Sequence, residues 1–169
     1  MPDPGRPRVG VRIGVDVGTV RVGLARSDPS GMLATPVRTI ARSGPNGGVD
    51  EIAREVAEQE AIEVVIGLPR TLAGTEGCAA AAVRAYATDV VRAIQPVPVR
   101  LVDERLTTVS AHQALHAAGR GGRKHRAVVD QVAAVMILQA ALDAERSLGR
   151  PPGAALEPDA VDPKEEDGT

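Results

Sequence analysis

Apolar runs near the start of the chain predict three consecutive β-strands. Residues 11–17 and 20–25 are rich in Val, Ile, Leu and Ala, and the Gly-Thr pair at 18–19 between them is typical of a tight turn. Residues 33–40 follow a second turn sequence, Asp-Pro-Ser-Gly at 28–31, and supply the third strand. Because strands joined by short turns pair antiparallel, we expect these three strands to form an antiparallel unit.

The remainder of the chain alternates helical and extended patterns. Ile52 and Val56 have helical spacing within 49–59, whereas 63–68 is a short, mostly apolar run that Pro69 ends. The same patterns predict further helices at 75–94, 108–118 and 128–148. They also predict one more strand, at 97–102. Helices between strands favour parallel crossovers. We therefore predict one α/β domain, with a five-stranded mixed sheet (strands 1–3 antiparallel) flanked by helices.

Both ends of the chain differ in composition from this domain, which we place at 11–149. Residues 1–10 contain three prolines and are predicted to form a flexible arm, and the acidic residues 150–169 a disordered tail. From residue 151 onward the chain has six acids and one base, so the preceding 150 residues have 19 bases and 16 acids. The predicted domain is therefore mildly basic, and the net charge of -2 of the whole chain comes from the tail.

The aromatic content excludes one class of nucleic-acid-binding site. The chain has one Tyr and neither Phe nor Trp. Stacking platforms for single-stranded nucleic acids need several aromatic side chains. Any nucleic-acid binding must therefore rest on backbone charge and shape.

The single cysteine and the lack of long apolar runs indicate the compartment. Cys78 cannot form a disulfide within the chain, and no apolar run follows the basic, Pro-rich start. No stretch approaches the roughly 18 apolar residues of a membrane span. We therefore expect a cytoplasmic protein without membrane contact. Cys78 is interpreted as a packing residue, although an exposed cysteine could also cross-link two chains.

Acidic residues occupy three places, each at the end of a predicted strand or the start of a predicted helix, where they could act as metal ligands or have only a structural role. Asp16 ends an apolar strand and would be costly to bury without a cation, although it could simply start a turn. Asp103 and Glu104 follow the strand at 97–102, and since neighbours on a strand point to opposite faces, only one of them is expected to be a ligand. Both could instead be solvated loop acids. Asp130 falls in the first turn of the last predicted helix, where opposing the helix dipole would be a sufficient role.

Taken together, these acids indicate metal-assisted phosphodiester chemistry. Three carboxylates at the ends of separate elements supply the oxygen ligands that Mg²⁺ or Mn²⁺ requires, and two such ions can clamp the attacking and leaving oxygens of a phosphodiester. A basic, Gly-rich segment at 119–126 precedes Asp130 and is predicted to be a loop. We favour phosphate contact by this loop over a merely solvated loop, because a nuclease-like acid lies beside it.

Five sequence blocks, in order, resemble the YqgF/RuvX family. They are Asp16-x-Gly18-x-x-Arg21-x-Gly23-x-Ala25, Ile66-Gly67-Leu68-Pro69, Gly74-Thr75-Glu76, Asp103-Glu104-Arg105-Leu106-Thr107-Thr108 and Asp130-x-x-Ala133-Ala134-x-x-Ile137-Leu138. The match spans about residues 11–146, and five blocks in family order are far more specific than any one of them. This family has a ribonuclease H-like fold related to the RuvC resolvases, and its members are known as pre-16S rRNA nucleases or Holliday junction resolvases.

The resemblance implies which residues form the site. Asp16, Glu104 and Asp130 would be the catalytic, metal-binding acids, with Asp16 holding both Mg²⁺ or Mn²⁺ ions and the other two holding one each. We predict substrate contact by a wider set: Arg21, Gly67, Pro69, Arg105, Arg123, Lys124 and Arg126. Family members often have a lysine shortly before the last acid, whereas this chain has Ala127 near that place, so the basic role would fall to Lys124 or Arg126.

The predicted activity is metal-assisted hydrolysis of nucleic acid, and the family name suggests the 5′ end of the 16S rRNA precursor as substrate. A four-way DNA junction is the alternative, and its symmetrical cleavage would call for a homodimer. Two other hypotheses are a catalytically silent nucleic-acid-binding protein that keeps the fold and an ATP-binding domain of the actin/sugar-kinase type, which also uses Asp-x-Gly-Thr. The ATPase needs two such domains, whereas about 140 folded residues supply one.

Overall fold

The computed structural model describes residues 8–71, 73–107 and 123–157, with the backbone alone at 106–107 and 123–127. Its elements are the strands β1 (Arg12–Val17), β2 (Arg21–Ser27), β3 (Ala34–Ala41), β4 (Glu63–Leu68), β5 (Val99–Asp103) and β6 (Ala154–Leu156), the helices α1 (Val49–Glu58), α2 (Cys78–Ile94) and α4 (Arg123–Leu148), and the 3-10 helix η1 (Glu104–Thr107). No helix in this part of the chain is long and apolar enough to cross a membrane.

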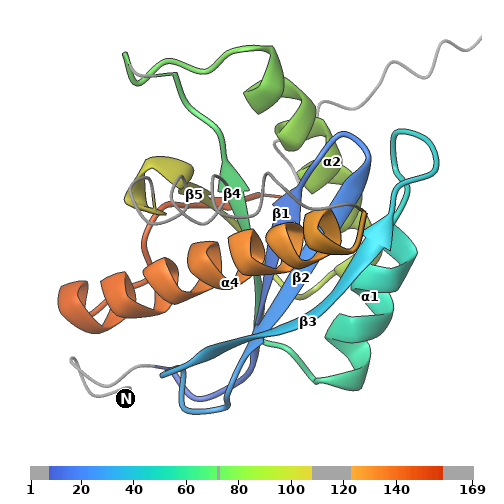
Figure 1. Cartoon of the computed structure of the whole chain (residues 1–169). Coiled ribbons are helices and arrows are strands. Elements are labelled where there is room, and N and C mark those ends of the chain that lie inside the picture. The colour runs from blue at the N-terminus through green and yellow to red at the C-terminus, as the bar shows by residue number, and fades with distance from the viewer. Residues whose placement is uncertain (1–7, 72, 108–122, 158–169) are drawn as a thin grey trace, which may run out of the picture.

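The strands form one sheet in the order β3-β2-β1-β4-β5-β6 (Figure 1). β1, β2 and β3 are antiparallel neighbours, whereas β1, β4 and β5 run parallel. The predicted mixed sheet with antiparallel strands 1–3 is therefore confirmed. The predicted helix at 108–118 lies outside the described residues.

The sheet has six strands rather than the five predicted. The sixth, β6, lies inside the range predicted to be a disordered tail, and pairs antiparallel with β5 so that Leu156 is opposite Val99. Two alanines and one leucine form no recognisable strand pattern, and the pairing depends instead on the open edge that β5 offers. Regular structure therefore extends to Leu156, and residues 158–169 of the predicted tail are not described.

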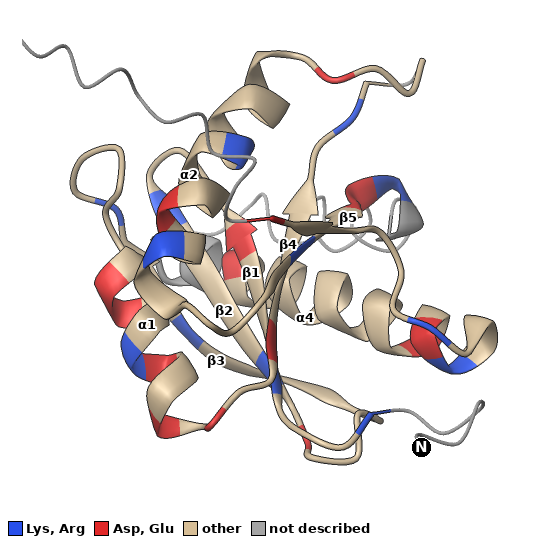
Figure 2. Ribbon diagram, turned by 180° about the vertical axis from the view of Figure 1, so that it is seen from behind, with Lys and Arg blue, Asp and Glu red and all other residues tan. Residues whose placement is uncertain are grey.

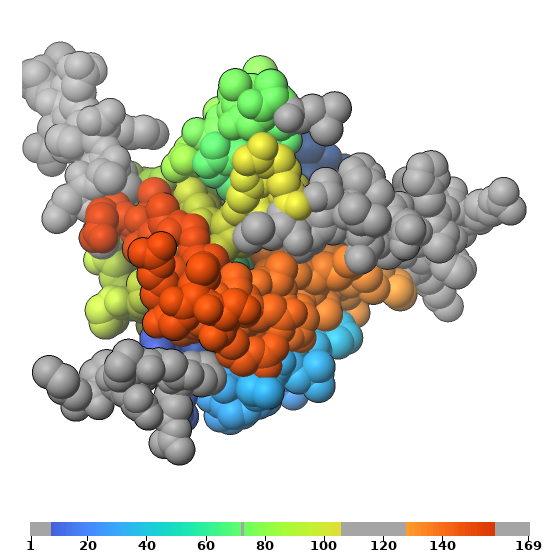
Figure 3. Space-filling model, turned by 90° about the vertical axis from the view of Figure 1, so that its left-hand side faces the viewer, coloured from blue at the N-terminus to red at the C-terminus, as the bar shows by residue number. Residues whose placement is uncertain are grey.

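Different side chains cover the two faces of the sheet, because neighbours along a strand alternate. α1 and α2 lie behind the sheet in Figure 1 and cover a core of branched aliphatic side chains and Tyr86. α4 crosses the opposite face, where Ala25, Val65 and Val102 pack against Ala134 and other small or aliphatic residues of the helix. Figure 3 shows the molecule from the left-hand side of Figure 1, where α4 (orange) lies between β3 (light blue) and η1 (yellow).

Glycines allow α4 to lie directly on β1 and β2. A Cβ atom at Gly14 would lie 2.7 Å from the Cβ of Leu138, and one at Gly23 would lie 2.1 Å from the carbonyl oxygen of Asp130. Atoms in folded proteins do not pack this closely, so the helix occupies space that any larger residue would need. The glycine at position 23 is thus explained by the approach of the helix that carries Asp130.

Gly23→Ala should destabilise the protein by about 3 kcal/mol, the upper end of the usual range for overpacked sites, because the added methyl group meets backbone that cannot rotate away. Gly77→Ala is a control, since nothing lies within 4 Å of the corresponding Cβ position and only a small helix-capping preference is lost. Urea unfolding of both variants measures the difference. Equal free energies of unfolding would show that α4 does not rest on Gly23.

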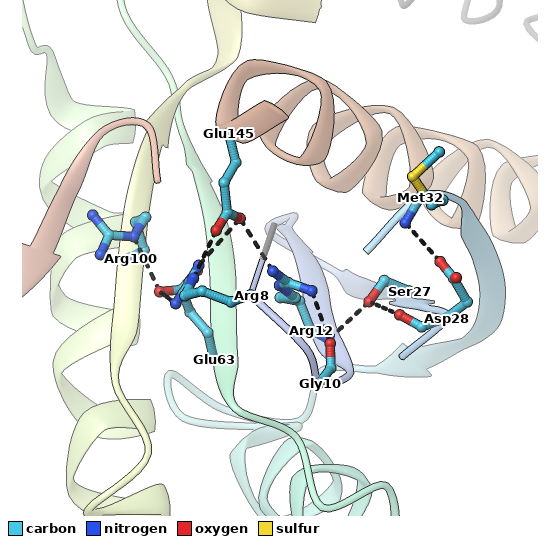
Figure 4. Close-up of polar contacts among 9 residues, drawn as sticks. All are labelled: Arg8, Gly10, Arg12, Ser27, Asp28, Met32, Glu63, Arg100 and Glu145. Atoms are coloured by element: carbon cyan, nitrogen blue, oxygen red, sulfur yellow. Dashed lines mark hydrogen bonds and ion pairs between the residues drawn. The ribbon is translucent and has the colours of Figure 1, made fainter. Parts of the chain in front are cut away.

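A buried ion-pair network holds the other end of α4 (Figure 4). Glu145 accepts hydrogen bonds from Arg8 Nε at 2.7 Å and Arg12 Nη2 at 3.3 Å, and Glu63 accepts from Arg8 Nη2 at 3.0 Å and Arg100 Nε at 3.1 Å. Arg12, Glu63 and Glu145 are almost completely buried. Arg8 belongs to the segment predicted to be a flexible arm, but these two carboxylates hold it against the domain.

Cys78 begins α2 and is exposed. The interpretation of this residue as a packing residue is therefore wrong. The buried face of the helix starts with Ala80 and continues through Val83 and Ala87, and Cys78 falls outside it. Cross-linking of two chains through its thiol stays a prediction.

Candidate active site

Asp16 lies near the end of β1, on the sheet face that α4 covers. Its Cα is paired with that of Gly23, and Gly14, two residues earlier on the same face, lies against α4. Burial, together with the charges of Glu104 and Asp130, raises the pKa of Asp16 to about 7. The structure therefore places Glu104 and Asp130 close enough to Asp16 to act on it electrostatically.

Glu104 reaches the same region from the end of β5, where it begins η1. A Cβ atom at Gly67 on β4 would lie 3.0 Å from the Glu104 Cγ and 3.1 Å from its Oε1, so the glycine makes room for this side chain. Burial raises the pKa of Glu104, and the neighbouring charge of Asp103 raises it further. Gly67, predicted to contact substrate, is thus packed against one of the acids.

Asp103 has a different environment from its neighbour Glu104. Its carboxylate accepts a hydrogen bond from Arg105 Nη2 at 2.6 Å and pairs with Arg70 Nε at 3.6 Å. The hydrogen bond from Arg105 lowers the pKa of Asp103, opposite to the shift at Glu104. The predicted strand alternation does not describe this pair, because β5 ends at Asp103 and Glu104 begins η1. Arg105, a predicted substrate contact, is bound to Asp103, and Figure 2 shows basic positions after β4 and in η1 at this end of the sheet.

Asp130 lies about two turns into α4 rather than in its first turn, because the helix begins at Arg123 and not at residue 128. The prediction took the start of the helix from its apolar periodicity, but basic residues are good helix formers without that pattern. The explanation of Asp130 through the helix dipole is therefore wrong. Its Oδ2 accepts a hydrogen bond from Arg21 Nε at 2.8 Å.

The remaining predicted substrate contacts are placed as follows. Arg21, the first residue of β2, binds Asp130, and Pro69 follows β4 directly and is partly buried. Part of the predicted basic loop is helical, since α4 includes Arg123, Lys124 and Arg126. The side chains of these three residues and of Ala127 lie outside the described part of the structure.

The acids fit a divalent cation in charge and donor type. Within the range described above, no group of three or more His, Cys, Asp or Glu is arranged to hold a metal ion. Three carboxylates nevertheless supply the hard oxygen donors that Mg²⁺ or Mn²⁺ prefers. Burial and the charges of Glu104 and Asp130 raise the pKa of Asp16, and a bound cation would lower it.

The ion pair between Arg21 and Asp130 was not predicted. The two residues are 109 positions apart, and neither has a local sequence feature that identifies its partner. The available signal was that both residues belong to the blocks that resemble the family. Those blocks identify both residues as part of the family pattern, but they do not indicate that the two side chains form an ion pair.

The chain is similar to known proteins over most of its length. The sequence model of the RuvX family, described as Holliday junction resolvase, matches residues 10–144. A protein of Nocardioides sp. named "Putative pre-16S rRNA nuclease" is 56% identical over 155 residues, which cover 89% of this chain and 98% of the relative. A protein of the same name from Streptomyces coelicolor is 53% identical, and the match covers 92% of this chain and 93% of the relative.

The fold is also similar to solved structures. T. thermophilus RuvC in complex with a Holliday junction substrate has a TM-score of 0.54 at 15% identity, covering 85% of this chain and 99% of that chain. A second Thermus thermophilus RuvC structure gives a TM-score of 0.51 at 18% identity. At these identities the likeness concerns the fold alone, and it confirms the ribonuclease H-like prediction. With its motif blocks, its fold and its relatives in agreement, the chain belongs to the RuvX family.

Proposed function

We propose that this protein is a metal-dependent nuclease that hydrolyses phosphodiester bonds, with the 5′ end of the 16S rRNA precursor as its substrate. The carrying observation is that burial and the charges of Glu104 and Asp130 together raise the pKa of Asp16 to about 7. Such strongly perturbed carboxylates mark candidate functional sites. The rRNA nuclease name of relatives more than 50% identical supports the choice of substrate. That substrate would place the protein in the cytoplasm.

Asp16, Glu104 and Asp130 would hold Mg²⁺ or Mn²⁺. When bound, such ions lower the pKa of water and stabilise charge on phosphate oxygens. The protein itself holds the three carboxylates on rigid elements, because Gly67 leaves room for Glu104 and Gly23 lets α4 bring Asp130 against β2. Basic residues at the start of α4 would contact substrate phosphates without reading sequence.

A four-way DNA junction is the second candidate substrate. The family description and the likeness to the fold of RuvC favour it. Symmetrical cleavage of two strands would require two copies of the chain, whereas trimming one RNA end would not. Light scattering with and without reductant tests for the dimer, since the exposed thiol of Cys78 is the group that would make a dimer sensitive to reductant.

Glu104→Gln should lower the rate of Mn²⁺-dependent cleavage by about 100-fold or more, because an amide lacks the charge that the cation requires. Asp103→Asn is the matched control, since it neutralises the adjacent carboxylate, which pairs with arginines instead. It should keep the rate within about tenfold of wild type. Cleavage is measured on the rRNA precursor, a four-way junction and a linear duplex, in Mn²⁺ and in EDTA.

Each outcome of this experiment has a distinct meaning. Equal losses in the two variants would contradict the assignment of Glu104 over Asp103. A preference of the wild-type protein for the junction over the precursor RNA would favour the second candidate substrate. No cleavage of any substrate in Mn²⁺ would overturn the nuclease proposal in favour of a silent nucleic-acid-binding protein.

A further inference from the structure

Arg21 is a protein cation that lies within the candidate active site. It begins β2, and its carbonyl oxygen accepts a hydrogen bond from the Gly18 N–H at 2.9 Å across the tight turn from β1. Its Nε donates to Asp130 Oδ2 at 2.8 Å, and the two side chains are 28% and 23% exposed. Because a guanidinium cannot be deprotonated in proteins, the carboxylate of Asp130 has a permanent positive partner.

Arg21 pairs directly with one of the three acids of the candidate site, Asp130. Burial raises the pKa of both Asp16 and Glu104, and the charge of Asp130 contributes to the shift at Asp16. The carboxylate that Arg21 binds is therefore one of three that a divalent cation would also attract. A guanidinium and a metal ion that share one carboxylate repel each other and compete for its oxygens.

We propose that Arg21 is an internal counter-ion that competes with divalent metal for Asp130, so that metal binding weakens or breaks this ion pair. The proposal rests on the proposed function, because it takes Asp130 as a metal ligand. A partly exposed ion pair is weak enough for a divalent cation to displace. It follows that Arg21 lowers the affinity for metal and stabilises the metal-free protein, in which it offsets the repulsion among the acids.

Calorimetric titration of the full chain with Mn²⁺ tests the competition directly. Arg21→Gln should bind Mn²⁺ about two- to fivefold more tightly than wild type, which is the factor expected for removing a partly exposed ion pair. The same variant should melt at a lower temperature in EDTA and gain more from added Mn²⁺. Arg21→Lys keeps the charge and should bind Mn²⁺ within about twofold of wild type.

Arg26→Gln is the matched control for the loss of one positive charge. Arg26 is on the same strand, is exposed, and alternates onto the face away from α4. Its replacement should leave the Mn²⁺ affinity unchanged, because the charge lies outside the site. Equal tightening in Arg26→Gln and Arg21→Gln would show a general charge effect and overturn the proposal.

Two further results would also overturn it. Mn²⁺ binding about 10- to 100-fold weaker in Arg21→Gln would mean that Arg21 orients Asp130 as a ligand instead of competing for it. Unchanged affinity would mean that the pair does not affect the metal at all. In both cases the nuclease proposal stands if the wild-type protein binds Mn²⁺ and cleaves, whereas a wild-type protein that binds no Mn²⁺ overturns both proposals.

Discussion

Replacing Asp16 by Asn should abolish metal-dependent cleavage and, at neutral pH, make the metal-free protein more stable. The amide keeps the shape of the side chain but lacks the charge that a divalent cation requires, so the cleavage rate should fall by about 100-fold or more. In the metal-free protein the carboxylate is buried, and the charges of Glu104 and Asp130 repel it. Neutralising it removes both the burial penalty and the repulsion.

The gain in stability from Asp16→Asn should depend on pH in a defined direction. The pKa of Asp16 rises from an ordinary value of 3.8 to about 7 in the folded protein. Between these values the folded protein keeps a proton that the unfolded chain has lost, so wild-type stability falls as pH rises from about 4 to about 7. Below this window the substitution should change stability little. Above it the variant should gain a few kcal/mol, at about 1.4 kcal/mol for each unit by which the pKa is shifted.

Asp28→Asn is a control with the opposite sign. Hydrogen bonds from the Ser30 hydroxyl and from the backbone N–H groups of Leu33 and Met32 hold the pKa of Asp28 at about 2. This substitution should therefore lower stability above about pH 4, lose its effect as pH falls toward 2, and leave cleavage unchanged. Thermal unfolding in EDTA between pH 3 and 8 and cleavage in Mn²⁺ test both variants. Wild-type turnover by Asp16→Asn would remove Asp16 from the site.

Glu145→Ala should reduce folding stability by about 3–5 kcal/mol, a large part of the stability of a typical domain. The buried carboxylate of Glu145 accepts hydrogen bonds from Arg8 and Arg12. Arg12 is 1% exposed, and its Nε has no hydrogen-bond partner in the described structure. Without Glu145 the guanidinium of Arg12 would stay buried without the carboxylate that neutralises it.

Urea denaturation at pH 7 measures the free energy of unfolding of this variant. Asp143→Ala, two residues earlier on α4, is the control, because Asp143 is exposed and its pair with Arg146 lies at the surface. Its loss should cost less than about 1 kcal/mol. Glu145→Gln keeps a hydrogen-bond acceptor without the charge and should fall between the two. Equal stabilities of the two alanine variants would show that the buried network does not stabilise the fold.

Local patterns were sufficient to predict most of the sheet. The apolar runs at 11–17 and 20–25 predicted the antiparallel pair that the structure contains. Glu104, expected to alternate with Asp103 along a strand, instead begins η1. β6 was missed because three residues carry no periodicity, and its pairing depends on an edge that a distant strand provides. The start of α4 was placed too late because the charged residues that open it lack an apolar face.

Contacts between distant residues could not be predicted in this way. Arg8 and Glu145 are 137 positions apart, and Arg21 and Asp130 are 109 positions apart. An arginine in a Pro-rich terminal segment, or at the start of a strand, shows no local sign of its partner. Both pairs exist because α4 crosses β1 and β2, and that crossing is a property of the tertiary fold.

α4 connects the candidate active site to the buried ion-pair network at the opposite end of the sheet. Asp130 and Glu145 lie about 22 Å apart along this helix. Near the midpoint of this stretch, Leu138 packs against Gly14 of β1, so the helix could tilt about this contact. If the contacts of Glu145 with Arg8 and Arg12 were lost, a small tilt at that end would swing Asp130 in the opposite direction. Substitutions in the ion-pair network, far from the acids of the candidate active site, would then displace Asp130.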